Sequence, residues 1–237
     1  MTEHELLNIE TSIMNIYVTS AIAGLKEKLN GYVALLNYRY TNLCVKAELG
    51  ALLPVTVIAD KEYNLEDVAV VFTPTKYQFD IHPKLRDYLQ PIIDGIFDVH
   101  PEFKLEIQQV EKSDDQRDKH LLYTMPEVDN DRHDLLENLT KVFYEECDAD
   151  IDKELALHTG GLPELAGKMS VEDIDEIKDE LFNIRDEYHD KTKELKQEKL
   201  IETEEAYQRY LAANEGKNLA EGEIDFTKCM RLGQVEE

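Results

Sequence analysis

Two long helical patterns after residue 125 constrain the fold more than any other feature of the sequence. The first should begin near Asp129 and end at Gly160-Gly161, where glycine favours the end of a helix. The second should begin at Ser170, which forms a capping box with Asp173, and run to about residue 211. We expect the two to pack as an antiparallel hairpin. The expected buried positions are Leu135, Leu136, Leu139, Val142, Phe143, Ile151 and Leu155 in the first helix, and Val171, Ile174, Ile177, Leu181, Ile184, Tyr188 and Leu195, spaced like a coiled-coil seam, in the second.

The first 124 residues predict a different kind of structure. Residues 5–29 have apolar side chains at helical spacing, and Asn30-Gly31 should end that helix. Pro83–Phe97 reads as a further helix, which Pro91 should break or kink. A charged loop is expected at 111–119. Short β-rich runs predict strands at 32–40, 55–59, 68–72, 77–81, 103–110 and 121–123.

These patterns predict an α+β protein in three parts. Residues 1–124 should form a small mixed α+β module with the N-terminal helix, and residues 125–213 a long acidic antiparallel helical hairpin. Residues 214–237 contain few apolar side chains and should form a flexible tail.

The net charge of −25 is concentrated in the C-terminal half. Residues 1–110 carry a net charge of −6 and residues 111–237 carry −19. Proteins that coat DNA or RNA neutralise phosphates with lysine and arginine, so this charge excludes that class and argues against docking on anionic membranes. With no apolar run long enough to span a membrane and no leader pattern, we expect a cytoplasmic protein.

The sequence contains no motif of a known catalytic class, so we predict no enzymatic activity, cofactor, metal or small-molecule substrate. One repeat is chemically suggestive: Phe79-Asp-Ile-His-Pro83 recurs as Phe97-Asp-Val-His-Pro101. Asp and His two residues apart on a strand point the same way, so the two copies could offer two carboxylates and two imidazoles to a metal. The alternative, which we favour, is that both copies are strand-to-turn junctions with an extended residue before proline.

The acidic helices have a charge density close to that of a DNA strand. Residues 172–190 carry a net charge of −7 over about 27 Å of helix, and the same length of one DNA strand carries about 8 charges. Such rows could occupy a cationic groove meant for DNA, although an acidic solubilising surface would have the same composition. The candidate partner-binding carboxylates are Glu145, Glu146, Asp148, Asp150, Asp152, Glu172, Asp173, Asp175, Glu176, Asp179, Glu180, Asp186 and Glu187.

The main basic cluster lies further along the second helix. It comprises Lys191, Lys193, Lys196 and Lys199, and glutamates interrupt it. A solvated helix face with ion pairs one turn apart is the expected structure, and a weak DNA contact is the alternative.

Size, low pI and the acidic helical pair make the chain resemble the acidic DNA-mimic proteins of bacteriophages, in particular the early host-takeover inhibitors of RNA polymerase from large lytic Bacillus phages. The resemblance implies binding to the β and β′ subunits of bacterial RNA polymerase, or to another basic nucleic-acid-binding protein, and shut-off of host transcription. It implies a location in the host cytoplasm or nucleoid.

The element order is also similar to that of ribosome recycling factor: one helix, an α+β insertion and two long helices. Leu122-Tyr-Thr-Met-Pro126 resembles that family's entry into its second long helix. The family's basic helix that faces ribosomal RNA is acidic here, at Tyr144–Asp150. Our main hypothesis is therefore a DNA-mimic inhibitor of RNA polymerase. The alternative is an acidic assembly or translation-associated interaction protein with the element order of ribosome recycling factor but no recycling activity.

Overall fold

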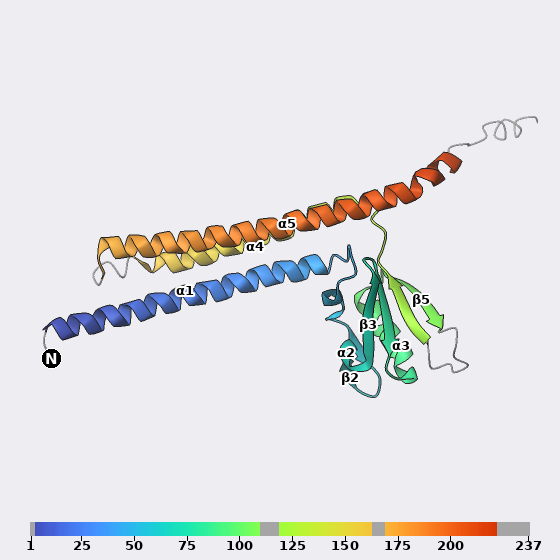
Figure 1. The fold of residues 1–237 in the computed structure, drawn as a ribbon, viewed down its shortest axis with the longest axis horizontal. Helices are drawn as coiled ribbons and strands as arrows, with labels where there is room; N and C mark the ends of the chain where they lie inside the picture. Colours follow the sequence, from blue (N-terminus) through green and yellow to red (C-terminus); the bar gives the residue numbers. More distant parts are fainter. Residues whose placement is uncertain (1–2, 110–118, 163–168, 222–237) are drawn as a thin grey trace, which may run out of the picture.

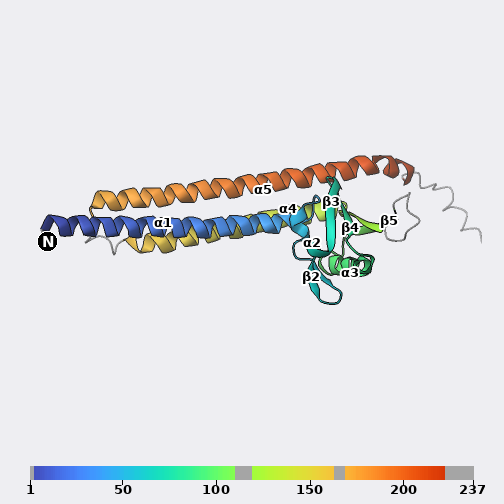
Figure 2. The same cartoon turned by 60° about the horizontal axis from the view of Figure 1, so that its bottom comes forward.

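The computed structural model describes residues 3–109, 119–162 and 169–221. Three long helices run side by side, and a small sheet module lies where the first of them ends, while the last continues past the module (Figure 1). The second view shows the same arrangement (Figure 2). The elements of the helical part are α1 (Glu3–Thr41), α4 (Asn130–Gly160) and α5 (Val171–Glu221).

Apolar side chains of all three helices meet in one core, so the expected hairpin is part of a three-helix bundle. Helix α4 runs antiparallel to α1 and α5, which run parallel to each other (Figure 1). The buried residues of this core are Leu25, Leu29, Leu36 and Tyr40 of α1, Cys147, Ile151 and Leu155 of α4, Leu162 beyond it, and Leu181, Ile184 and Tyr188 of α5. The bundle buries the a/d-like stripes that the sequence predicts on α4 and α5.

Both predicted helix starts in the bundle are confirmed by their caps. The backbone N–H of Arg132 donates to the Asp129 carboxylate at 2.9 Å at the start of α4. The N–H of Asp173 donates to the Ser170 hydroxyl at 3.1 Å at the start of α5. Each cap satisfies a backbone donor that the first helical turn leaves without a partner.

The predicted break at Asn30-Gly31 and the predicted strand at 32–40 are wrong, because α1 continues to Thr41. Leu29, Leu36 and Tyr40 follow one another at helical spacing and are buried in the bundle core. Tertiary burial therefore outweighs the local preference of Gly31 for a turn and of Tyr32–Tyr40 for a strand. Gly31 lies where an added Cβ would meet no atom within 4 Å.

The sheet module consists of a four-stranded antiparallel sheet and a two-stranded hairpin. The large sheet has the order β3-β4-β6-β5 and the hairpin pairs β1 with β2. The strands are β1 (Thr56–Ile58), β2 (Glu62–Asn64), β3 (Ala69–Thr75), β4 (Gln78–Pro83), β5 (Lys104–Gln109) and β6 (Lys119–Thr124); the helices are η1 (Leu49–Leu52), α2 (Leu65–Val68), η2 (Arg86–Tyr88) and α3 (Leu89–Val99). Five of these strands match predicted runs, and β2 was not predicted.

Helix α3 covers one face of the large sheet. Its buried Ile92 and Ile96 belong to the same core as Phe79 of β4 and Leu121 of β6. Pro91 lies in the first turn of α3 and does not kink it, which corrects the predicted break. A first-turn N–H has no acceptor within the helix, so proline loses nothing there.

The predicted α+β class is confirmed. The division at residues 124 and 213 stays a prediction, although α1 packs with α4 and α5 in the structure. Helix α5 extends beyond 213 to Glu221, so the helix ends later than expected. The expected flexible tail from 222 onward and most of the expected charged loop at 111–119 lie outside the described residues. None of the helices in the described ranges has an apolar stretch that could span a membrane.

The continuous α1 leads to a stability prediction. Gly31→Ala should raise the free energy of unfolding by about 0.5–1 kcal/mol, because alanine is the better helix former and the added methyl group enters open space. Urea denaturation measures the change. Gly95→Ala is the matched control, since its Cβ would lie 2.3 Å from the Thr56 carbonyl oxygen and should cost about 1–3 kcal/mol. A destabilising Gly31→Ala would mean that the chain turns at this position.

Candidate functional site: the acidic bundle and its junction with the sheet module

The predicted carboxylates do not form one uniform acidic row. All thirteen lie on α4 or on the first half of α5, toward the end of the bundle far from the sheet module (Figure 1). Five of them are paired with basic side chains of the chain, three with an arginine or a lysine and two with the His189 ring, which is charged only when protonated. These pairs are Glu146 with Arg39, Asp148 and Asp152 with His189, Asp186 with Arg185, and Glu187 with Lys191.

The other eight form no ion pair within the described residues. Six of them gather on the first three turns of α5, and the helix dipole favours the negative charge of the two in the first turn, Glu172 and Asp173. These eight are Glu145, Asp150, Glu172, Asp173, Asp175, Glu176, Asp179 and Glu180, and all but Asp150 are exposed. The bundle therefore presents a cluster of free carboxylates at the start of α5, while charges in its middle are partly neutralised.

The four lysines of the basic cluster do not share a surface role. The Lys199 ammonium is buried and donates to Glu202 at 2.7 Å. Lys196 lies 4.2 Å from the centre of the Tyr144 ring, and Lys191 pairs with Glu187. Lys193 is exposed. Because Lys199 is already buried and paired, it is not accessible to a phosphate, and the predicted weak DNA contact has no continuous basic face to use.

Glu154 of α4 is an acidic residue that points into the bundle. Its carboxylate accepts hydrogen bonds from Lys28 at 2.6 Å and from the Tyr32 hydroxyl at 3.1 Å, and it is only 4% exposed. The hydrogen bond from Lys28 lowers the pKa of Glu154 below its usual value although burial opposes this. The sequence carries the signal, because Glu154 falls between the buried Ile151 and Leu155.

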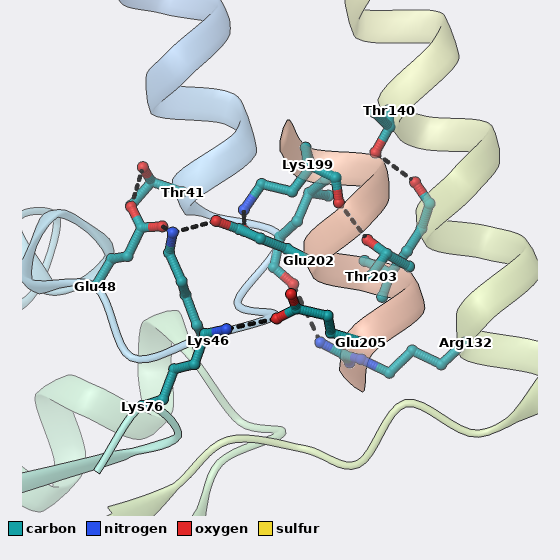
Figure 3. A network of polar contacts seen from close by, with 12 residues as sticks. Thr41, Lys46, Glu48, Lys76, Arg132, Thr140, Lys199, Glu202, Thr203 and Glu205 are labelled. Carbon is teal, nitrogen blue, oxygen red and sulfur yellow. Dashed lines mark hydrogen bonds and ion pairs between the residues drawn. The ribbon is translucent and has the colours of Figure 1, made fainter. Parts of the chain in front are cut away.

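A polar network holds the sheet module against the C-terminal half of α5 (Figure 3). It includes Lys46 in the linker after α1, Lys76 in the β3–β4 turn, and Glu202 and Glu205 on α5. Glu202 accepts from both Lys46 and Lys199, and Glu205 pairs with Lys76 at 2.6 Å. Two segments that are distant from α5 in sequence, the linker after α1 and the β3–β4 turn, are thus tied to one stretch of α5.

Arg132 adds a buried contact to the junction. Its guanidinium donates to the Leu43 carbonyl oxygen at 3.1 Å, which ties the start of α4 to the beginning of the linker after α1. Burial lowers the pKa of Arg132, and nearby carboxylates partly oppose this. A small apolar core of Val45, Val128, Leu136 and Ala206 lies beside it.

A cavity of 280 Å³ opens at this junction. Its wall contains the cations Lys46 and Lys199 and the anions Glu48, Glu198 and Glu202. Opposite charges already neutralise one another there, so the cavity shows no preference for an anionic or a cationic ligand. We therefore regard the junction as a structural element that orients the module.

The Asp/His repeat does not assemble as one site. Asp80 and His82 lie on β4 and approach His120 of β6, whereas His100 lies beside Cys44 and Glu102. The first copy ends a strand as expected. The second copy is at the end of α3, with His100 as its cap, so the predicted strand-to-turn junction at Phe97–Pro101 is wrong. Burial of apolar residues against the sheet continues the helix to Val99.

Comparisons with solved structures identify the fold. The solution structure of ribosome recycling factor aligns with a TM-score of 0.64 and 14% sequence identity, covering 79% of this chain and 97% of that chain. A second match has a TM-score of 0.52 and 19% identity, and covers 78% of this chain and 98% of that chain. It comes from models for the T. thermophilus ribosome recycling factor and the E. coli elongation factor G bound to the E. coli post-termination complex.

The chain has a ribosome-recycling-factor-like fold. No protein-family model matches the sequence, and no curated protein matches it. The three helices alone make up about half of the chain, so a match over 79% includes the sheet module as well as the bundle. The similarity to ribosome recycling factor therefore includes both the helical bundle and the sheet module.

This fold corrects the main functional hypothesis. A DNA-mimic inhibitor that binds bacterial RNA polymerase and shuts off host transcription is not supported, and the alternative based on ribosome recycling factor is favoured. The expected partners, the β and β′ subunits or another basic nucleic-acid-binding protein, are corrected with it. The whole-chain traits of low pI and acidic helices misled the prediction, because they describe a surface and not a fold. No comparison links the chain to phage DNA-mimic proteins, and that resemblance stays untested.

The junction yields a prediction about Glu202. Burial alone would raise the pKa of this carboxyl group, but hydrogen bonds from Lys199 and Lys46 hold it below its usual value. Glu202→Gln should lower the free energy of unfolding at pH 7 by about 1–3 kcal/mol, because it leaves Lys199 buried without an anion. The ionised form contributes stability above the unfolded-state pKa of about 4.3, and this contribution is lost as the pH falls through the lower folded-state pKa.

Chemical denaturation of both proteins between pH 7 and pH 3 measures this difference, which should shrink in acid. Glu205→Gln is the matched control: its pair with Lys76 is exposed on both sides, so the loss should stay below about 1 kcal/mol. An equal decrease in the free energy of unfolding for Glu202→Gln and Glu205→Gln would show that the buried Lys199 does not need Glu202 as its counter-ion.

Proposed function

We propose that the chain is a non-enzymatic, translation-associated interaction protein that binds a protein component of the ribosome or of a ribosome-bound factor, and that it does not recycle ribosomes. The observation that carries this proposal is the likeness to ribosome recycling factor over both the bundle and the sheet module. An association with ribosomes would place the chain in the cytoplasm.

The surface of α4 supports a protein partner over an RNA partner. The segment Tyr144–Asp150 resembles the family's RNA-facing helix in position but carries Glu145 and Glu146, both exposed. These carboxylates would repel the phosphates that a basic helix would bind. A partner surface with lysines and arginines would complement these carboxylates. The free carboxylates at the start of α5 are also negative and enlarge the surface that such a partner could contact.

Binding should be electrostatic and sensitive to salt. The test is co-sedimentation of the chain with purified E. coli 70S ribosomes, with and without elongation factor G, at low and high salt. Neutralising four unpaired carboxylates together, Glu145→Gln, Glu172→Gln, Glu176→Gln and Asp179→Asn, should weaken association about tenfold to a hundredfold, since each exposed pair contributes about 0.2–1 kcal/mol.

The matched control neutralises four exposed carboxylates of the sheet module, Glu62, Asp87, Asp98 and Glu106, and should bind like the unmodified chain. The absence of co-sedimentation at low salt, with or without elongation factor G, would contradict the proposal. So would efficient splitting of post-termination complexes by the chain together with elongation factor G.

A further inference from the structure

The face of the large sheet opposite α3 carries a group of metal-ligating side chains. Asp80 and His82 are two residues apart on β4 and therefore share a face. The neighbouring pair Ile81–Leu121 sets the register with β6, which places His120 beside His82. Phe79 and Ile81 point to the opposite face and into the core with α3.

Three potential ligand atoms converge at this point. The Asp80 carboxylate lies 2.5 Å from His120 Nδ1 through one oxygen and 3.1 Å from His82 Nε2 through the other. The ligand atoms of the three residues all lie within 4.8 Å of one another. The two imidazole rings are stacked, with centroids 4.7 Å apart and planes 17° from parallel.

The three side chains differ in how firmly they are held. Those of Asp80 and His120 are 20% and 15% exposed, whereas that of His82 is 41% exposed and contacts the edge of the exposed Phe72 ring. Asp80 and His120 thus form a largely buried, hydrogen-bonded pair on this face of the sheet. His82 has room to change its rotamer.

We propose that Asp80, His82 and His120 bind a zinc ion. Two imidazole nitrogens and one carboxylate oxygen are ligands that zinc prefers, and three protein ligands leave the fourth position of a tetrahedral site to water. Zinc–ligand bonds of about 2.0–2.1 Å place neighbouring ligand atoms about 3.3 Å apart in a tetrahedron. The 3.1 Å distance between Asp80 and His82 is already near this value. The 2.5 Å distance between Asp80 and His120 is that of a direct hydrogen bond, so this pair has to open by about 0.8 Å as the metal replaces the shared proton. Rotation of His82 then brings its ring nitrogen to the third ligand position.

Magnesium and calcium favour sites made of oxygen ligands, so the two imidazoles select a transition metal. This inference revises the sequence-based expectation that the chain has no metal site. The only metal site considered from the sequence combined the two Asp/His repeats with each other, and it was not the favoured interpretation. The third ligand is His120, which lies outside both repeats and becomes a neighbour only through strand pairing.

The other group of candidate ligands is committed to the core. His100 Nε2 donates to the Ala51 carbonyl oxygen at 2.7 Å, and the ring stacks on Phe103 at 4.4 Å. Burial raises the pKa of the Cys44 thiol to about 12. The environment of Cys44 and His100 is therefore one of packing and internal hydrogen bonding.

Equilibrium dialysis with zinc chloride tests the proposal on the full chain, after removal of metals and with excess Mg²⁺ present to occupy exposed carboxylates. The unmodified chain should bind one zinc ion. Asp80→Asn, His82→Gln and His120→Gln should each weaken binding by about 100-fold or more, since even partners behind the ligands are worth 10–100-fold. Circular dichroism checks that each variant is folded.

His189→Gln is the matched control, because it removes an imidazole that contacts two carboxylates, Asp148 and Asp152, in the bundle. His189→Gln should bind zinc like the unmodified chain. When Co²⁺ replaces zinc in the unmodified chain, its spectrum should show no sulfur-to-cobalt charge-transfer band, because none of the three proposed ligands is a cysteine. The proposal is overturned if the unmodified chain binds no zinc under these conditions. It is also overturned if His189→Gln loses binding equally, or if Cys44→Ser abolishes binding while His120→Gln retains it.

Discussion

The burial of the apolar stripe of α1 between α4 and α5 is the interaction on which the rest of the structure depends. Leu25, Leu29, Leu36 and Tyr40 lie on one side of α1 and are almost completely removed from solvent. A hairpin of α4 and α5 alone would leave the facing residues Ile151 and Ile184 partly uncovered. Because α1 also carries the chain into the sheet module, the same contact fixes where the module begins.

This packing explains how a strongly acidic chain keeps a bundle together. Nearly all carboxylates of α4 and α5 point outward, where water weakens their mutual repulsion. Glu154 points inward and is compensated by Lys28 and Tyr32 from α1, and the partly buried Glu202 is compensated by Lys46 and Lys199. The apolar seam is thus independent of the surface charge, so one fold can carry surfaces of different charge.

The sequence predicted those features that depend on residues close together in the chain. The caps at Asp129 and Ser170 are local hydrogen bonds; the helix start near Asp129 and the Ser170 cap were predicted, and both were found. Most strands of the module were also found near their predicted positions, because alternation and turn residues are local signals.

The features that the sequence missed depend on partners far away in the chain. Residues 32–40 are rich in residues that favour strands, and only the facing helices make this segment helical. His120 stands alone in the sequence and acquires two neighbours through the pairing of β4 with β6. Lys199 looked like part of a basic surface, and the linker residue Lys46, which shares Glu202 with it, is more than 150 positions away.

The position of the module relative to the bundle rests on a different kind of interaction from the bundle itself. The apolar contact at the junction is small, with Val45, Val128, Leu136 and Ala206 as its buried members. Most of the remaining contacts are ion pairs and hydrogen bonds, among them those of Glu202 and Arg132. Such contacts are directional and respond to salt and pH more than apolar packing does. The bundle therefore gives the molecule its shape, and the charged junction sets the angle at which the sheet module is presented to a partner.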